Sequence, residues 1–168
     1  RFANSAPLRG KMLENEKLST DLDALQLTNL LKAADSYRQS GNRSAAKAQL
    51  YAGIAVDDKL EFRNNLASLL MDEGRISEAD LHLKKAMAFD PEVPDVLTNL
   101  GNLRRLQQRV TEAEGHYLRA LEIDPTASMA RNNYAALLAS QGDVERAIGE
   151  YEKVLAQDPN SFHSHFML

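Results

Sequence analysis

The sequence contains no cysteine, which excludes a disulfide framework and any zinc site built on cysteine ligands. It also has no apolar run approaching the ~18 residues of a membrane-spanning helix, so we expect no direct membrane insertion. Basic residues do not cluster into a long run, and the net charge is −4. Such a chain has no general electrostatic attraction for nucleic acid, which we therefore do not expect as a partner.

Catalytic patterns are missing as well. The sequence has no serine–histidine–aspartate elbow, no phosphate-binding loop and no dinucleotide fingerprint. His163 and His165 are two residues apart, so on a helix they diverge and form a poor metal-binding pair. We therefore expect no catalytic residues, no cofactor and no metal, and a protein that is not itself an enzyme.

The most regular feature that is present is a repeat of 34 residues. Pro91, Pro125 and Pro159 follow one another at this period, and each is preceded by aspartate. Two further series keep the same period: Asn65, Asn99 and Asn133, and Ala79, Ala113 and Ala147. A fixed period in this range is typical of a solenoid built from one supersecondary motif. Solenoids present a long concave surface that binds other molecules.

Each repeat is predicted to contain two helices. In the first helix, residues such as Leu66, Leu69 and Leu70 have the i, i+3, i+4 spacing of one helical face. A short break follows, where Gly74 and Gly142 can adopt the left-handed conformation that ends a helix. The middle repeat has Gln108 at this position, so we expect a tighter or strained turn there. Because proline disfavours helix at the residue before it, the Asp-Pro pair ends the second helix.

This pattern resembles the tetratricopeptide repeat. The matching positions are Leu66-Ala67, Leu70, Gly74, Ala79, Leu83, Ala86 and Pro91; Leu97, Leu100-Gly101, Ala113, Tyr117, Ala120 and Pro125; and Tyr134-Ala135, Leu138, Gly142, Ala147, Tyr151 and Pro159. The resemblance implies an all-α fold, a right-handed superhelical solenoid of antiparallel helix pairs. Arg63, Arg104 and Arg131 stand where the family usually has apolar residues, and we expect them to be half exposed.

The repeats predict the division of the chain. We expect a tether or partly disordered leader over residues 1–20, a degenerate first repeat over 21–59, and full repeats over 60–93, 94–127 and 128–161. Residues 162–168 are interpreted as the truncated start of a further helix. An end left without a capping helix after Phe162 suggests self-association by stacking.

The resemblance also implies a binding groove lined by the first helix of each repeat. The candidate residues are Asn64, Asn65, Asn99, Asn102, Asn132, Asn133, Arg105, Lys32 and Arg38. An asparagine amide both donates and accepts hydrogen bonds, so a row of them can hold the backbone of an extended peptide. The other interpretation, that these amides bond neighbouring helices, stays open. The basic residues that bind an acidic C-terminus in chaperone-binding members of the family are not matched here.

The function indicated is a protein–protein interaction scaffold or adaptor that binds a peptide segment of a partner in its groove. The alternative is the substrate-selecting or regulatory arm of a larger enzyme, such as a glycosyltransferase, sulfotransferase or methyltransferase. We expect a cytoplasmic location, although the absence of cysteine fits the periplasm as well.

Overall fold

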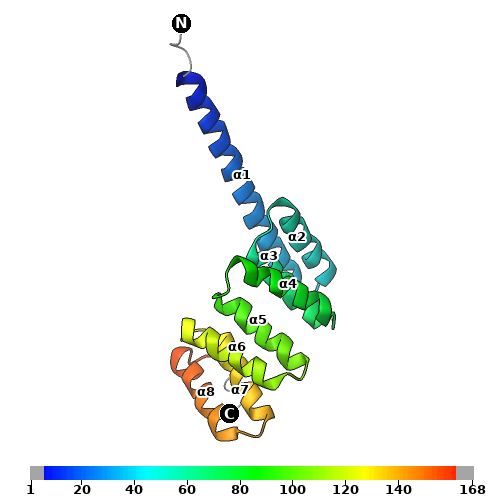
Figure 1. The fold of residues 1–168 in the computed structure, drawn as a ribbon, viewed down its shortest axis with the longest axis vertical. Coiled ribbons are helices and arrows are strands. Elements are labelled where there is room, and N and C mark those ends of the chain that lie inside the picture. The colour runs from blue at the N-terminus through cyan, green and yellow to red at the C-terminus, as the bar shows by residue number, and fades with distance from the viewer. Residues whose placement is uncertain (1–5, 162–168) are drawn as a thin grey trace. The chain divides into compact units, whose positions relative to one another are not determined.

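The computed structural model describes residues 6–161, where the only regular secondary structure is α-helix (Figure 1). The helices are α1 (Ala6–Gln39), α2 (Arg43–Val56), α3 (Leu60–Asp72), α4 (Ile76–Phe89), α5 (Pro94–Leu106), α6 (Val110–Ile123), α7 (Ser128–Ser140) and α8 (Val144–Gln157). The predicted all-α fold is confirmed. None of the described helices is both long enough and apolar enough to span a membrane.

The chain divides into two compact units, Arg1–Phe62 and Arg63–Leu168. In the first unit, α1 packs along α2, and Leu27, Ala34, Ala46 and Leu50 are buried. Helix α1 is 34 residues long and runs without a break across the boundary that we predicted at residue 20. The division of the chain into a leader and repeats stays a prediction, and the predicted truncated helix at 162–168 lies outside the described residues.

The second unit contains successive antiparallel helix pairs, of which α5 with α6 and α7 with α8 are clearest (Figure 1). Each second helix also packs against the first helix of the next repeat, α4 on α5 and α6 on α7. Consecutive first helices meet too, since α5 contacts α7. The core of the last two pairs is a cluster of buried residues: Ala113, Tyr117, Tyr134, Ala135, Leu137, Leu138, Ala147 and Tyr151. This packing places α5 and α7 side by side.

The turns between paired helices share one backbone conformation. Gly74 and Gly142 have φ of 72° and 84°, and Gln108 at the same place in the middle repeat has φ of 64°. After Gln108, the Arg109 amide donates to the Arg104 carbonyl at 2.8 Å, which closes the end of α5. The middle turn is therefore not tighter than the others. Gln108 takes the left-handed conformation that glycine adopts without steric penalty.

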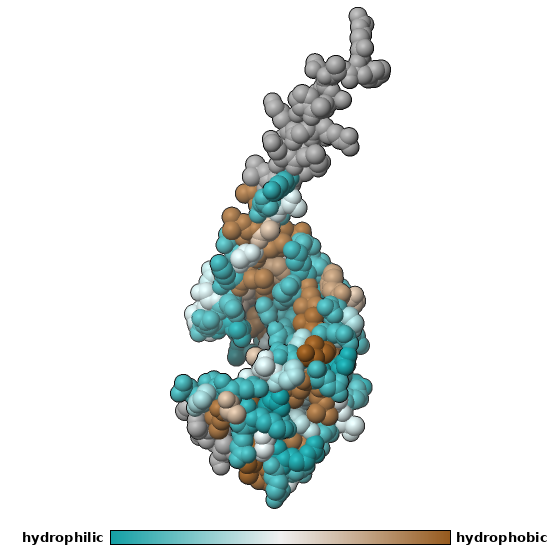
Figure 2. Space-filling model, turned by 90° about the vertical axis from the view of Figure 1, so that its left-hand side faces the viewer, coloured by the Kyte–Doolittle hydropathy of each residue, from teal (hydrophilic) through white to brown (hydrophobic). Residues whose placement is uncertain are grey.

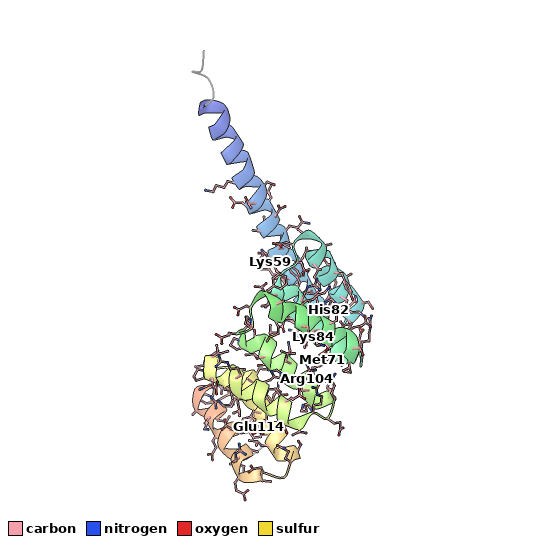
Figure 3. All side chains as sticks on the ribbon, in the orientation of Figure 1. Lys59, Met71, His82, Lys84, Arg104 and Glu114 are labelled. Atoms are coloured by element: carbon pink, nitrogen blue, oxygen red, sulfur yellow. The ribbon has the colours of Figure 1, made fainter. Side chains whose placement is uncertain are left out.

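The prediction that three arginines are half exposed is wrong. Arg63 is buried, and the side chains of Arg104 and Arg131 are only 11% and 12% exposed. Arg104, labelled in Figure 3, forms an ion pair with Asp80 of α4 at 2.9 Å, and Arg131 forms one with Glu150 of α8 at 2.7 Å. These carboxylates neutralise the guanidinium groups, which is the condition for burying a charge between packed helices.

Candidate peptide-binding groove

The first helices of the second unit meet around one open pocket of about 220 Å³. Its lining comes from three helices: Ser68, Met71 and Asp72 from α3, Asn102, Arg105 and Leu106 from α5, and Asn133 from α7. We call it the groove pocket. It brings together Asn102, Arg105 and Asn133, which are three of the residues predicted from the sequence. Met71, labelled in Figure 3, lies near the end of α3 and supplies part of the apolar lining.

Helical spacing explains why these side chains converge. Asn102, Arg105 and Leu106 have the spacing i, i+3, i+4, which places them on one face of α5. Ser68, Met71 and Asp72 repeat that spacing on α3, 34 residues earlier. Because equivalent helices pack side by side in a repeat array, equivalent faces line the same side of it.

Most polar groups of the groove pocket have no partner within the described residues. Ser68, Asp72 and Asn133 form no side-chain hydrogen bond there, and all three are at least partly exposed. The Asn102 carbonyl oxygen accepts a hydrogen bond from the Tyr117 hydroxyl at 2.7 Å. That bond leaves the Asn102 amide hydrogens for a bound molecule. The pocket can thus both donate and accept hydrogen bonds.

The charges in the groove pocket differ from those elsewhere in the second unit. Most arginines of the second unit form ion pairs with carboxylates; these are Arg75, Arg104, Arg109, Arg119, Arg131 and Arg146. Arg105 is exposed and forms no ion pair with any carboxylate of the described residues. Asp72, which lines the pocket from α3, is likewise exposed without an ion pair there. The pocket therefore has one positive and one negative group available to a ligand.

Outside the pocket, the predicted asparagines differ from one another in hydrogen bonding and exposure. The Asn99 amide donates to the carbonyl oxygen of buried Asn64 at 2.9 Å and so joins α5 to α3. Asn65 is exposed, and Asn132 is half-buried. The Asn64–Asn99 pair supports the interpretation that some of these amides bond neighbouring helices, whereas Asn65 and Asn133 are available to a ligand.

Two predicted residues belong to the first unit, which we describe by itself. Lys32 is exposed on α1, and Arg38 forms an exposed ion pair with Asp35 at 2.9 Å. The self-association surface predicted after Phe162 lies outside the described residues. Among the residues that are described, no group of three or more histidine, aspartate or glutamate side chains could hold a metal ion.

Sequence reasoning missed Met71 and Leu106 as pocket residues, and it treated Tyr117 only as a core residue. The i, i+3, i+4 spacing with Ser68 and Asn102 could have indicated the first two. The role of Tyr117 had no signal in the sequence, because its hydroxyl reaches Asn102 only through the packing of α6 on α5.

Comparisons with known proteins agree with this architecture. Two family models described as tetratricopeptide repeat match residues 64–128 and 116–149. Among solved structures, PilF of Pseudomonas aeruginosa is 24% identical, with a TM-score of 0.74 over 87% of this chain and 69% of that one. The first tetratricopeptide repeat domain of Spaghetti (RPAP3) bound to an HSP90 peptide is 23% identical, with a TM-score of 0.59 over 64% of this chain and 86% of that one. An O-GlcNAc transferase mutant from Thermobaculum terrenum is 26% identical, with a TM-score of 0.66 over 69% of this chain and 22% of that one. A search of curated proteins gives no match.

Proposed function

Because the chain belongs to the tetratricopeptide repeat family, we propose that it is a scaffold or adaptor module whose groove binds an extended segment of a protein partner. The observation that carries this proposal is the groove pocket, where three first helices converge and most polar groups have no partner within the described residues. The similar Spaghetti domain, which was solved with a peptide, supports this type of ligand.

The chemistry of the groove fits a peptide backbone. An extended peptide offers an N–H donor and a C=O acceptor at nearly every residue. Asn65 and Asn133 can satisfy both kinds of group, and neither side chain has a hydrogen bond within the described residues that it would have to break. Met71 and Leu106 add apolar surface for a neighbouring side chain of the ligand. Recognition would thus combine backbone hydrogen bonds with one shallow apolar contact.

The test compares the capture of partner proteins from a lysate by two variants. Asn65→Ala with Asn133→Ala removes two groove amides, and we expect capture to fall while the helical circular dichroism stays unchanged. The matched control is Lys85→Ala with Glu152→Ala, because these residues are exposed on the second helices α4 and α8. Capture by the control should equal that of the unchanged chain. Equal capture by all three proteins would mean that the groove amides do not bind the partner.

A second candidate function is the substrate-selecting or regulatory arm of a larger enzyme. The similarity to the Thermobaculum terrenum O-GlcNAc transferase favours it, since the match covers most of this chain but 22% of that one. In this case the same groove would bind a substrate protein of the enzyme. The test of this second candidate is the gene sequence downstream of Leu168. An encoded transferase domain would support it, and a stop codon there would exclude a domain that follows in the same chain.

A further inference from the structure

Helix α1 continues well beyond the helix on which it packs. It has 34 residues and α2 has 14, so only the C-terminal part of α1 can pack along α2 (Figure 1). The buried residues Leu27 and Ala34 belong to that part, whereas residues 19–26 are all exposed. Helical propensity alone gives a segment of this length little stability in water. The part of α1 before Leu27 therefore has a surface that the described residues of the first unit leave uncovered.

That surface carries apolar side chains. Leu22 and Leu25 are 58% and 57% exposed. Beside them lies a shallow hollow of about 520 Å³, lined by six residues of α1 between Leu22 and Ala33 and by Gln49 of α2. We call it the α1 hollow. Figure 2 shows hydrophobic surface in this upper part of the described molecule. Exposed leucines next to a hollow form a surface of the kind that a second helix covers.

The charges along the same part of α1 have a definite order. Asp21 and Asp23 lie at the N-terminal end of the α1 hollow, and Lys32 lies at its other end. All three are exposed and form no ion pair within the described residues, whereas Asp35 and Arg38 pair with each other. Two such helices in opposite orientations place the acidic end of each against the basic end of the other. The surface is thus complementary to itself.

We propose that two copies of this chain form a dimer in which the α1 helices pack antiparallel, each covering the α1 hollow of the other. A two-fold axis between residues 26 and 27 brings Asp21 of one copy level with Lys32 of the other. The same register places Leu22 of one copy between Leu30 and Ala33 of the other, inside its hollow. Such an interface uses one patch twice, so four exposed leucines become covered. The groove pocket of the second unit plays no part in this contact.

The charges also distinguish this arrangement from a parallel one. In a parallel pair without offset, each residue lies level with its own copy, so Asp21 would face Asp21 and Lys32 would face Lys32. Like charges that face each other destabilise a helix pair. The antiparallel orientation instead gives two attractive contacts, one at each end of the interface.

The first experiment is sedimentation equilibrium of the full chain over a wide range of concentration. We expect the mean mass to rise from monomer to dimer. Leu22→Ser with Leu25→Ser should weaken the dimer by at least about 100-fold, because four leucines lose their burial. The matched control is Leu81→Ser with Leu118→Ser, since these leucines are exposed on α4 and α6. The control should dimerise like the unchanged chain, and circular dichroism should show equal helix content in all three proteins.

A charge exchange tests the orientation without removing apolar surface. Lys32→Glu places like charges together, and we expect it to weaken the dimer by about three- to tenfold at low salt. Adding Asp21→Lys and Asp23→Lys to this variant reverses both ends of the interface and should restore the affinity. A parallel dimer would not respond in this way, because Lys32→Glu would replace one pair of like charges by another.

Cross-linking provides an independent measure of the register. The chain contains no cysteine, so a single introduced thiol is unique. A mixture of Asp21→Cys and Lys32→Cys chains should form a disulfide between the two variants on air oxidation. Neither variant should cross-link with itself, because two copies of either position would lie about 16 Å apart along the antiparallel helices, too far for a disulfide.

Three results would overturn the inference. A monomeric mass at every concentration would mean that the α1 hollow does not bind a second copy and that any occupant is a different protein. A dimer that keeps its affinity in the Leu22→Ser, Leu25→Ser variant would lie on another surface. Cross-linking of a single variant with itself would exclude the antiparallel register. Each result leaves peptide binding in the groove unaffected, because that function is tested by Asn65→Ala with Asn133→Ala.

Discussion

Gln108 holds a backbone conformation that favours glycine, so we expect Gln108→Gly to stabilise the chain. Its φ is 64°, and the equivalent residues of the neighbouring turns are Gly74 and Gly142. The left-handed conformation costs a residue with a side chain about 1–2 kcal/mol. Glycine loses more backbone entropy on folding, which offsets about 0.5–1 kcal/mol of that gain. The net expectation is an increase of ~0.5–1 kcal/mol in the free energy of unfolding.

The assay is urea unfolding followed by far-ultraviolet circular dichroism. The midpoint should rise while the slope m stays constant, since the surface exposed on unfolding hardly changes. Gly142→Gln is the reverse control: its φ is 84°, no atom lies within 4 Å of an added Cβ, and the expected change is a loss of similar size. If Gln108→Gly lowers the midpoint, or if both variants leave it unchanged, the strain assigned to this turn does not exist.

Two further predictions concern packing and charge. Gly101→Ala should destabilise the chain by about 1–3 kcal/mol, because the added methyl group overlaps the Tyr117 ring. Gly115→Ala on α6 should instead stabilise it by about 0.5–1 kcal/mol, because the added Cβ meets no atom within 4 Å. Thermal unfolding of both variants measures the two changes in stability, and changes of the same sign would contradict the packing argument. Burial raises the pKa of Asp80, but the hydrogen bonds and charges of Lys84 and Arg104 outweigh burial and hold the pKa below its ordinary value of 3.8. Asp80 therefore stabilises the fold above that value, and its contribution is lost as the pH falls through the lowered pKa. Asp80→Asn should make the free energy of unfolding less dependent on pH below about 4, as measured by urea unfolding at several pH values; an identical pH dependence would show that this carboxylate does not contribute.

Much of the secondary structure could be predicted from local sequence. Leu66, Leu69 and Leu70 are buried on one face of α3, as their spacing predicts. Gly74 and Gly142 could be identified as turn residues because glycine by itself tolerates the left-handed φ that these turns have. Gln108 is the exception: the two adjoining helices and the hydrogen bond from Arg109 to Arg104 impose the conformation that this residue disfavours.

The exposure of the arginines could not be predicted in the same way. Arg104 is largely buried because α4 supplies Asp80, and Arg131 is largely buried because α8 supplies Glu150. Neither carboxylate is close to its arginine in sequence. The sequence therefore showed only a charged residue at a usually apolar position, and not the ion pair that allows its burial. The groove residues show the same limit. Asn99 and Asn133 occupy equivalent positions, yet Asn99 bonds Asn64 while Asn133 lines the groove pocket.

The sequence by itself determined the family and the helix pairs, because a 34-residue period and helical spacing are properties of the chain read in order. Only the tertiary structure decided which polar groups remain available to a ligand. That outcome depends on distances between side chains of different helices. The hydroxyl of Tyr117 reaches Asn102 because Gly101 lets the ring approach α5. Arg105 forms no ion pair with a carboxylate of the described residues, although Asp72 lines the same pocket.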